Sequence, residues 1–192
     1  MDTLKFIKQR RTVRKFKKRP VSRASIDKIA EAGASAPSPH NSQPWQFTVI
    51  QNKGLKQRLL IRLKKASGRY MTSFRILFNN TLEIMQGAPV LIFVYNTRIL
   101  SRKTRAFGEP YFSVTHLSEI EGISAAIQNM HLAAGAFGLG MAWLTIPLFA
   151  GKEISRMMKT ENELIAVLAL GYPAEQPKGL HRKAISSILK YE

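Results

Sequence analysis

The 192-residue sequence contains no cysteine, which excludes disulfide bonds, thiolate catalysis, iron–sulfur clusters and cysteine-ligated zinc. No apolar run approaches the roughly 18 residues that a membrane-spanning helix needs, and the first residues lack the apolar core of a secretory signal. Hydrophobic residues make up 45% of the chain and charged residues only 22%, which excludes a disordered protein. We therefore expect a globular cytoplasmic protein that does not span a membrane.

Acidic residues are scarce, since the chain holds 12 of them against 30 lysines and arginines. Residues 1–75 contain 19 basic and 3 acidic residues, whereas the rest of the chain contains 11 and 9. Such an excess is typical of a solvated basic surface, or of a surface that attracts phosphate, an acidic protein or a membrane. Too few aromatic residues lie among these cations to stack bases, which argues against a nucleic-acid partner.

Two basic segments account for most of this excess. The first covers residues 5–23 and the second covers residues 53–75. In the second segment, four leucines between positions 55 and 63 recur at helical spacing. This spacing predicts a helix with one apolar face and one basic face.

The motifs of several enzyme classes are missing. The four histidines form no i, i+4 pair and no HExxH pattern, which argues against a zinc site. The sequence also lacks a GxSxG elbow, a GxGxxG motif after a strand and a GxxxxGK[ST] loop. Because no nucleophile, metal site or acid–base pair stands out, we expect the difficult chemistry to belong to a bound cofactor.

Hydrophobic periodicity predicts helices first, and then strands separated by helices. The predicted helices are 2–10, 22–34, a basic helix after a turn at 52–54, 74–86, 120–137 and 152–158, and the predicted strands are 45–50, 89–95 and 166–171. The helix over 120–137 is nearly uncharged after its start, so we expect it to be buried on all sides. These elements predict one α+β domain over residues 1–192, with a sheet of mixed topology.

The first basic segment contains one arrangement that suits an anion. Where the first helix gives way to extended chain, Arg10, Thr12 and Arg14 would project to one side at a period of two. Two guanidinium groups that flank a hydroxyl group can bind a phosphate through charge-assisted hydrogen bonds. The alternative is a solvated basic turn.

Several segments, spread over nearly the whole chain, resemble those of a known protein family. The segment from Pro37 to Trp45, which reads PSPHNSQPW, is the most specific of them. The matching segments are residues 10–16, 37–47, 87–92, 128–140, 169–173 and 182–183. In these segments the chain resembles the FMN-dependent nitroreductase family.

The resemblance implies a fold and an assembly. Members of this family have a mixed β-sheet flanked by helices and form an intertwined homodimer. Two FMN molecules lie in clefts between the protomers. The uncharged helix over 120–137 resembles the central helix of the family, and it is more apolar than the surface of a monomer tolerates.

The resemblance also implies which residues bind FMN. Arg14 would approach the pyrimidine side of the ring, where a cation stabilises the anionic reduced flavin. For Ser38 and Asn41, ordinary turn chemistry is the alternative. The FMN-binding residues implied for one protomer are Arg10, Arg11, Thr12 and Arg14, with Arg182 and Lys183 closing on the phosphate, and those implied for the partner's loop are Pro37, Ser38, Pro39, Asn41 and Gln43.

The chain departs from the family where a backbone N–H group usually faces the flavin N5 atom. Here the corresponding segment contains Ile146, Pro147 and Leu148, and proline has no N–H group to donate. The donor would therefore be Ile146 or Leu148, or would be missing. Arg69, Arg75 and Asn79 are candidates for further polar contacts with FMN.

The activity implied by the resemblance is hydride transfer from NAD(P)H through FMN to a nitroaromatic or quinone acceptor, in a ping-pong mechanism that requires no catalytic side chain. One alternative is the same fold reduced by an acidic electron carrier, such as ferredoxin or flavodoxin. Another is a dehalogenase or flavin-fragmenting enzyme. A third is a basic module that binds nucleic acid or an acidic protein, because a single FMN phosphate accounts for only part of the basic excess.

Overall fold

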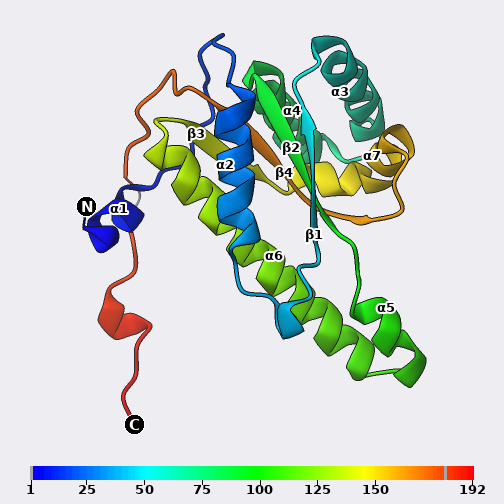
Figure 1. The fold of residues 1–192 in the computed structure, drawn as a ribbon. Helices are drawn as coiled ribbons and strands as arrows, with labels where there is room; N and C mark the ends of the chain where they lie inside the picture. Colours follow the sequence, from blue (N-terminus) through cyan, green and yellow to red (C-terminus); the bar gives the residue numbers. More distant parts are fainter. Residues whose placement is uncertain (1, 180) are drawn as a thin grey trace.

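A four-stranded antiparallel sheet lies at the centre of the computed structural model, which describes residues 2–179 and 181–192 (Figure 1). Its strands are β1 (Trp45–Ile50), β2 (Val90–Asn96), β3 (Gly140–Leu144) and β4 (Glu163–Gly171), in the order β1-β2-β4-β3. All three strand pairings are antiparallel. The predicted mixed topology is therefore not found among the four strands, and the parallel contact is an isolated bridge between Thr12 and Met141 that brings the N-terminal segment to the free edge of β3.

Two helices cover one face of the sheet. They are α2 (Arg23–Ala34) and α6 (Tyr111–Ala136), and Figure 1 shows them side by side in front of the strands. Ile29 of α2 and Ile127 of α6 pack with Ile92 and Leu168 of the sheet in one buried apolar cluster. Burial of each such side chain stabilises the fold by roughly 1.5–3 kcal/mol.

The opposite face carries α3 (Lys53–Ser67), α4 (Thr72–Gly87) and α7 (Gly151–Met158). Leu59, Phe78 and Ile154 from these helices pack with Phe93 and Val167 of the sheet. Strand β2 is therefore covered on both faces, as its continuous apolar sequence predicts. The α+β class predicted from the sequence is confirmed.

Shorter elements complete the chain. These are α1 (Thr3–Gln9), α5 (Ser101–Thr104) and the 3-10 turns η1 (Pro39–Asn41), η2 (Arg105–Phe107), η3 (Ile146–Ala150) and η4 (Ile185–Ser187). Within the described part of the chain, no helix is both long enough and apolar enough to cross a membrane.

Several boundaries agree with local sequence signals, and others do not. The Ser22 hydroxyl group accepts the N–H of Ser25 and caps α2, as predicted. The predicted turn at 52–54 is instead the start of α3, because the Asn52 side chain accepts the N–H of Leu55. Helix α6 begins at Tyr111, well before the predicted start at Ile120. Strand β3 was not predicted, because Gly-Met-Ala-Trp-Leu has neither β-branched residues nor clear alternation.

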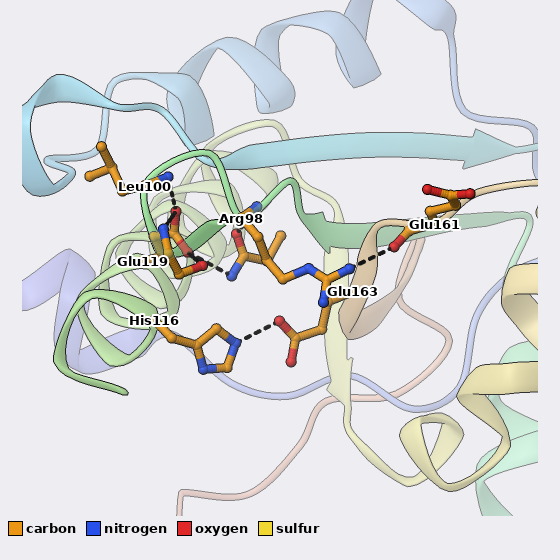
Figure 2. Close-up of polar contacts among 8 residues, drawn as sticks. Arg98, Leu100, His116, Glu119, Glu161 and Glu163 are labelled. Atoms are coloured by element: carbon orange, nitrogen blue, oxygen red, sulfur yellow. Dashed lines mark hydrogen bonds and ion pairs between the residues drawn. The ribbon is translucent and has the colours of Figure 1, made fainter. Parts of the chain in front are cut away.

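A buried carboxylate joins α6 to the segment that follows β2 (Figure 2). Glu119 of α6 is completely buried and accepts hydrogen bonds from the Leu100 N–H at 2.7 Å and the Ser101 hydroxyl at 2.7 Å. The Ser101 N–H and the Asn96 amide group, both at 3.3 Å, are longer contacts to the same carboxylate. These bonds fix the start of α5 against α6.

Candidate active site

Residues 10–17, here called the edge segment, run along the outer edge of β3. Thr12 forms the parallel bridge with Met141, and the Val13 N–H donates to the Met141 carbonyl at 3.1 Å. Further along, the Lys17 N–H donates to the Tyr172 carbonyl at 2.8 Å. Gly140 permits this approach, because a Cβ atom there would lie 2.6 Å from the Val13 side chain. The edge segment is therefore held by the sheet rather than by its own local structure.

A cavity of about 260 Å³ lies between the edge segment, α1 and the C-terminal end of α6. Helix α6 ends beside it, and Gly138 adopts the left-handed conformation (φ 68°) that follows many helix ends. The cavity is lined by Phe6, Gln9, Arg10, Arg11, Val13, His131, Leu132, Gly135, Leu139, Gly140 and Met141.

Cations converge on this cavity. Burial lowers the pKa of Arg10, and the neighbouring charges of Arg182 and Arg11 lower it further. Arg182 of the C-terminal tail therefore lies near Arg10, as the resemblance implies. None of these three arginines forms an ion pair with a carboxylate within residues 2–179 and 181–192. An anionic group bound here would remove the repulsion among them, so a phosphate fits the site.

His131 forms the inner wall of the cavity and is almost completely buried. Its Nε2 lies 3.1 Å from the Arg11 carbonyl oxygen, so the ring donates from Nε2. Burial, together with the charge of Arg10, lowers the pKa of His131 to about 4. The ring is therefore neutral at physiological pH, and it positions the backbone of the edge segment without adding charge.

We expect His131 to make the protein sensitive to acid. Because its pKa is about 4 in the folded state and 6.5 ordinarily, the unfolded state binds a proton more readily. Stability should therefore fall between pH 6.5 and 4, by up to about 3 kcal/mol. Urea unfolding at a series of pH values should show this loss in the wild type, and H131Q should lack it.

The matched control for this prediction is H181Q, which removes an exposed histidine from the tail. It should retain the acid sensitivity of the wild type. An NMR titration that places the pKa of His131 near 6.5 would contradict the prediction.

The loop from Pro37 to Gln43 is a strained turn. His40, Asn41 and Gln43 all have positive φ values, between 46° and 52°. The Ser38 hydroxyl accepts the Gln43 N–H at 3.0 Å, and the Gln43 amide group lies 3.4 Å from the Asn41 oxygen. Turn chemistry, the alternative reading of Ser38, is therefore present. Such strain persists only where the surroundings fix it, and it is common at functional sites.

The loop and the edge segment contact different parts of α6. Gly122 packs against the loop, because a Cβ atom there would lie 3.2 Å from the Pro37 carbonyl oxygen. His131 contacts the edge segment instead. These two α6 residues are about two and a half turns apart, so they lie on opposite faces and roughly 13 Å apart along the axis. Within one chain, the two groups of predicted residues are therefore not brought together.

The segment after β3 contains the predicted departure from the family. Pro147 is buried at the start of η3, and the Leu148 N–H donates to the Thr145 carbonyl at 3.0 Å. The Ile146 N–H has no backbone acceptor within the described residues. Of the two alternative donors, Ile146 is therefore the one with a free N–H group.

The three candidates between residues 65 and 86 are placed differently. The Arg69 guanidinium pairs with Glu153 of α7 at 2.7 Å, and Arg69 does not line the cavity described above. Arg75 and Asn79 lie on α4, exposed and half-buried respectively, and neither lines the cavity. Arg14 and Lys183 are exposed on the edge segment and the tail.

Sequence reasoning missed His131 and Gly140 as parts of the site. His131 follows Ile127 by four residues on the apolar stripe of α6, and a polar residue on such a stripe was an available signal. Glu175 was also missed, although its carboxylate accepts the N–H groups of Arg14 at 2.6 Å and Lys15 at 3.1 Å. No local pattern relates Glu175 to the edge segment.

Comparisons with known proteins agree with this architecture. A protein described as an NADH dehydrogenase/NAD(P)H nitroreductase in Methanothermobacter thermautotrophicus is 32% identical, covering 92% of this chain and 80% of that protein. Iodotyrosine deiodinase of Hydra vulgaris is 30% identical, covering 94% and 69%. A solved structure from Desulfovibrio desulfuricans, described as a nitroreductase in complex with FMN, has a TM-score of 0.74 and 26% identity, covering 100% and 97%.

The family model named Nitroreductase family matches residues 7–172, which include the edge segment, the loop and all four strands. The chain belongs to the nitroreductase family.

Proposed function

We propose that this protein is a homodimeric, FMN-dependent oxidoreductase that takes electrons from NAD(P)H and reduces nitroaromatic or quinone acceptors. The observation that carries this proposal is that Arg10 and Arg11, neither of which has a carboxylate partner within the described residues, line one cavity, with the charge of Arg182 close enough to lower the pKa of Arg10. Family membership and the relatives described as nitroreductases support it.

The residues at the cavity would hold the phosphate and ribityl parts of FMN. Arg10 and Arg11 supply cations, Thr12 supplies a hydroxyl group, and Arg182 and Lys183 approach from the tail. When bound, FMN supplies hydride chemistry between NAD(P)H and the acceptor. Arg14, in the middle of the edge segment, would place its charge beside the flavin ring, and the Ile146 N–H would donate to the ring edge.

A second copy of the chain would complete the site. The cavity of about 260 Å³ is smaller than the roughly 300–1,000 Å³ typical of small-molecule sites, so it holds only part of a flavin nucleotide. The loop that carries Pro37, Ser38, Pro39, Asn41 and Gln43 lies on the other side of α6. In a two-fold dimer, the loop of one protomer can face the edge segment of the other.

Exposed apolar side chains support this assembly. Tyr111, Val114 and Leu117 recur every three residues along α6 and are 56–60% exposed. Ile185 and Ile188, in the tail, are 66% and 62% exposed. Soluble monomers seldom expose large apolar patches, so a partner protomer would cover these side chains.

A mixing experiment tests both the cofactor and the assembly. R10Q removes a cation from the edge segment, and N41D adds an anion to the loop while keeping a residue type that tolerates positive φ. Each homodimer should bind little FMN. When equal amounts of the two variants are unfolded and refolded together, about half of the dimers should be heterodimers. Each heterodimer has one site in which both the edge segment and the loop are unaltered, so about a quarter of all sites should bind FMN again.

Visible flavin absorption measures this recovery, and NADH or NADPH should bleach the recovered flavin. Unmixed variants treated in the same way are the control. A wild-type protein that takes up no FMN would refute the proposal. Wild-type protein that binds FMN as a monomer would refute the shared site.

Reductive dehalogenation is a second candidate, favoured by the 30% identity to iodotyrosine deiodinase over most of the chain. The two activities differ in their acceptors. We expect the FMN-loaded protein to oxidise NADH with nitrofurazone and not with a halotyrosine. The reverse pattern would favour dehalogenation.

A further inference from the structure

The tertiary structure brings the two basic segments of the sequence together in a groove that is separate from the cavity of about 260 Å³ described above, here called the cofactor cavity. This basic groove, of about 680 Å³, lies between residues 17–21, the start of α3 and the end of α4. Five cations and no carboxylate line it. The cations are Lys17, Lys18, Arg19, Lys53 and Lys56.

Two of these cations have internal roles. The Lys56 ammonium donates to the Ala88 carbonyl at 2.6 Å and to the Gln86 carbonyl at 3.2 Å, so it holds the end of α4. Burial and the charge of Lys53 lower the pKa of Lys56. Arg19 lies over the Tyr172 ring, 4.0 Å from its centre. Lys17, Lys18 and Lys53 are exposed and have no ion-pair partner within residues 2–179 and 181–192.

The groove shares no lining residue with the cofactor cavity, but both border a third hollow. Lys17 also lines a neighbouring recess of about 620 Å³, and the wall of that recess includes Arg11 and Val13. Arg11 and Val13 in turn line the cofactor cavity. A protein that docks at the basic groove would therefore be separated from the cofactor cavity by this recess.

The chemistry of the groove favours carboxylate side chains over a single-stranded nucleic acid. Its lining contains no aromatic ring on which a base could stack. Lysines act as flexible point charges, and Asp or Glu side chains of a partner can reach them in such a recess.

We propose that the basic groove docks an acidic electron-carrier protein of the flavodoxin class, which supplies electrons to the flavin site. The proposal rests on the proposed function for the acceptor of those electrons. Two reduced carriers would each lose one electron, and with one proton from water these electrons equal the hydride that NAD(P)H supplies. The protein would then accept electrons through two separate routes.

Binding of fluorescently labelled flavodoxin to the purified full-length protein tests the proposal. We expect binding that weakens as salt increases. The variant K18Q/K53Q should weaken it about five- to tenfold, because two contacting charges are lost. Its FMN content and its activity with NADH and nitrofurazone should be unchanged.

The matched control is R58Q/R62Q, which removes two exposed charges from the same helix α3 but outside the groove. It should weaken flavodoxin binding by less than about threefold, as expected for charges that are distant and screened by salt. Equal weakening by both variants, or no flavodoxin binding at low salt, would overturn the proposal. Tighter binding of a short DNA duplex that K18Q/K53Q abolishes would also overturn it.

The experiment separates this inference from the proposed function. If flavodoxin does not bind while the protein retains FMN and oxidises NADH, only the docking proposal fails. If flavodoxin binds at the groove but the protein takes up no FMN, the proposed function fails and the docking surface remains.

Discussion

Replacing Arg10 with glutamine should weaken FMN binding by about tenfold to a hundredfold, the loss expected for a charge-assisted hydrogen bond to a phosphate. Arg10 is half-buried at the end of α1, where burial and the charges of Arg182 and Arg11 lower its pKa. A bound anion would offset both the burial of the Arg10 charge and its repulsion by the other arginines, so Arg10 contributes favourable binding energy only in the complex. Titration of the FMN-free protein with FMN, followed by fluorescence quenching, measures the change.

Two further variants distinguish the hydrogen bonds of the Arg10 guanidinium group from the effect of positive charge alone. R10K keeps the charge but cannot form two parallel hydrogen bonds, so its affinity should lie between those of the wild type and R10Q. K5Q removes one exposed charge from the same helix α1, outside the cavity, and should change the affinity less than threefold. Equal losses in K5Q and R10Q would show that net charge alone attracts the cofactor.

Replacing Glu119 with alanine should lower the free energy of unfolding by about 3–5 kcal/mol, because several buried donors lose their acceptor and a large buried side chain is removed. The Glu119 carboxylate accepts the N–H groups of Leu100 and Ser101, the Ser101 hydroxyl and the Asn96 amide (Figure 2). In the variant these donors remain buried without an acceptor, and a cavity replaces the side chain. Urea unfolding followed by circular dichroism measures the loss.

The nearby Glu121 provides the control, because it lies on the same helix but is exposed. E121A should change the free energy of unfolding by less than about 0.5 kcal/mol. S101A removes the hydroxyl group that donates to Glu119, and it should lower the free energy of unfolding by about 1 kcal/mol. A loss below 1 kcal/mol in E119A would show that the network does not hold α5 to α6.

Much of the fold could be predicted from local sequence signals. The buried strand β2 follows from an unbroken apolar run, and α2 begins where Ser22 caps it. Strand β3 could not be predicted, because its residues become a strand only by pairing with β4. The early start of α6 was also missed, because its first turns carry polar and aromatic residues whose helical conformation is supported by contacts with α5.

The candidate site was predicted less completely than the fold. The resemblance implied that Arg10 and Arg182 bind FMN, and in the structure the charge of Arg182 lies close enough to lower the pKa of Arg10. It did not identify His131, which supports the edge segment through the Arg11 carbonyl. Nor did it show that Leu148 donates its N–H to Thr145, which leaves Ile146 as the free donor.

The sequence by itself determined the class of fold, the family motifs and the excess of positive charge, because periodicity, motif spacing and composition are local properties. Only the tertiary structure decided which cations share a space. Arg10 and Arg11 line one cavity near the charge of Arg182, and Lys18 and Lys53 line a separate groove. These encounters depend on how strands pair and helices pack, and such contacts join residues that no local pattern relates. The same packing places the loop and the edge segment on opposite faces of α6.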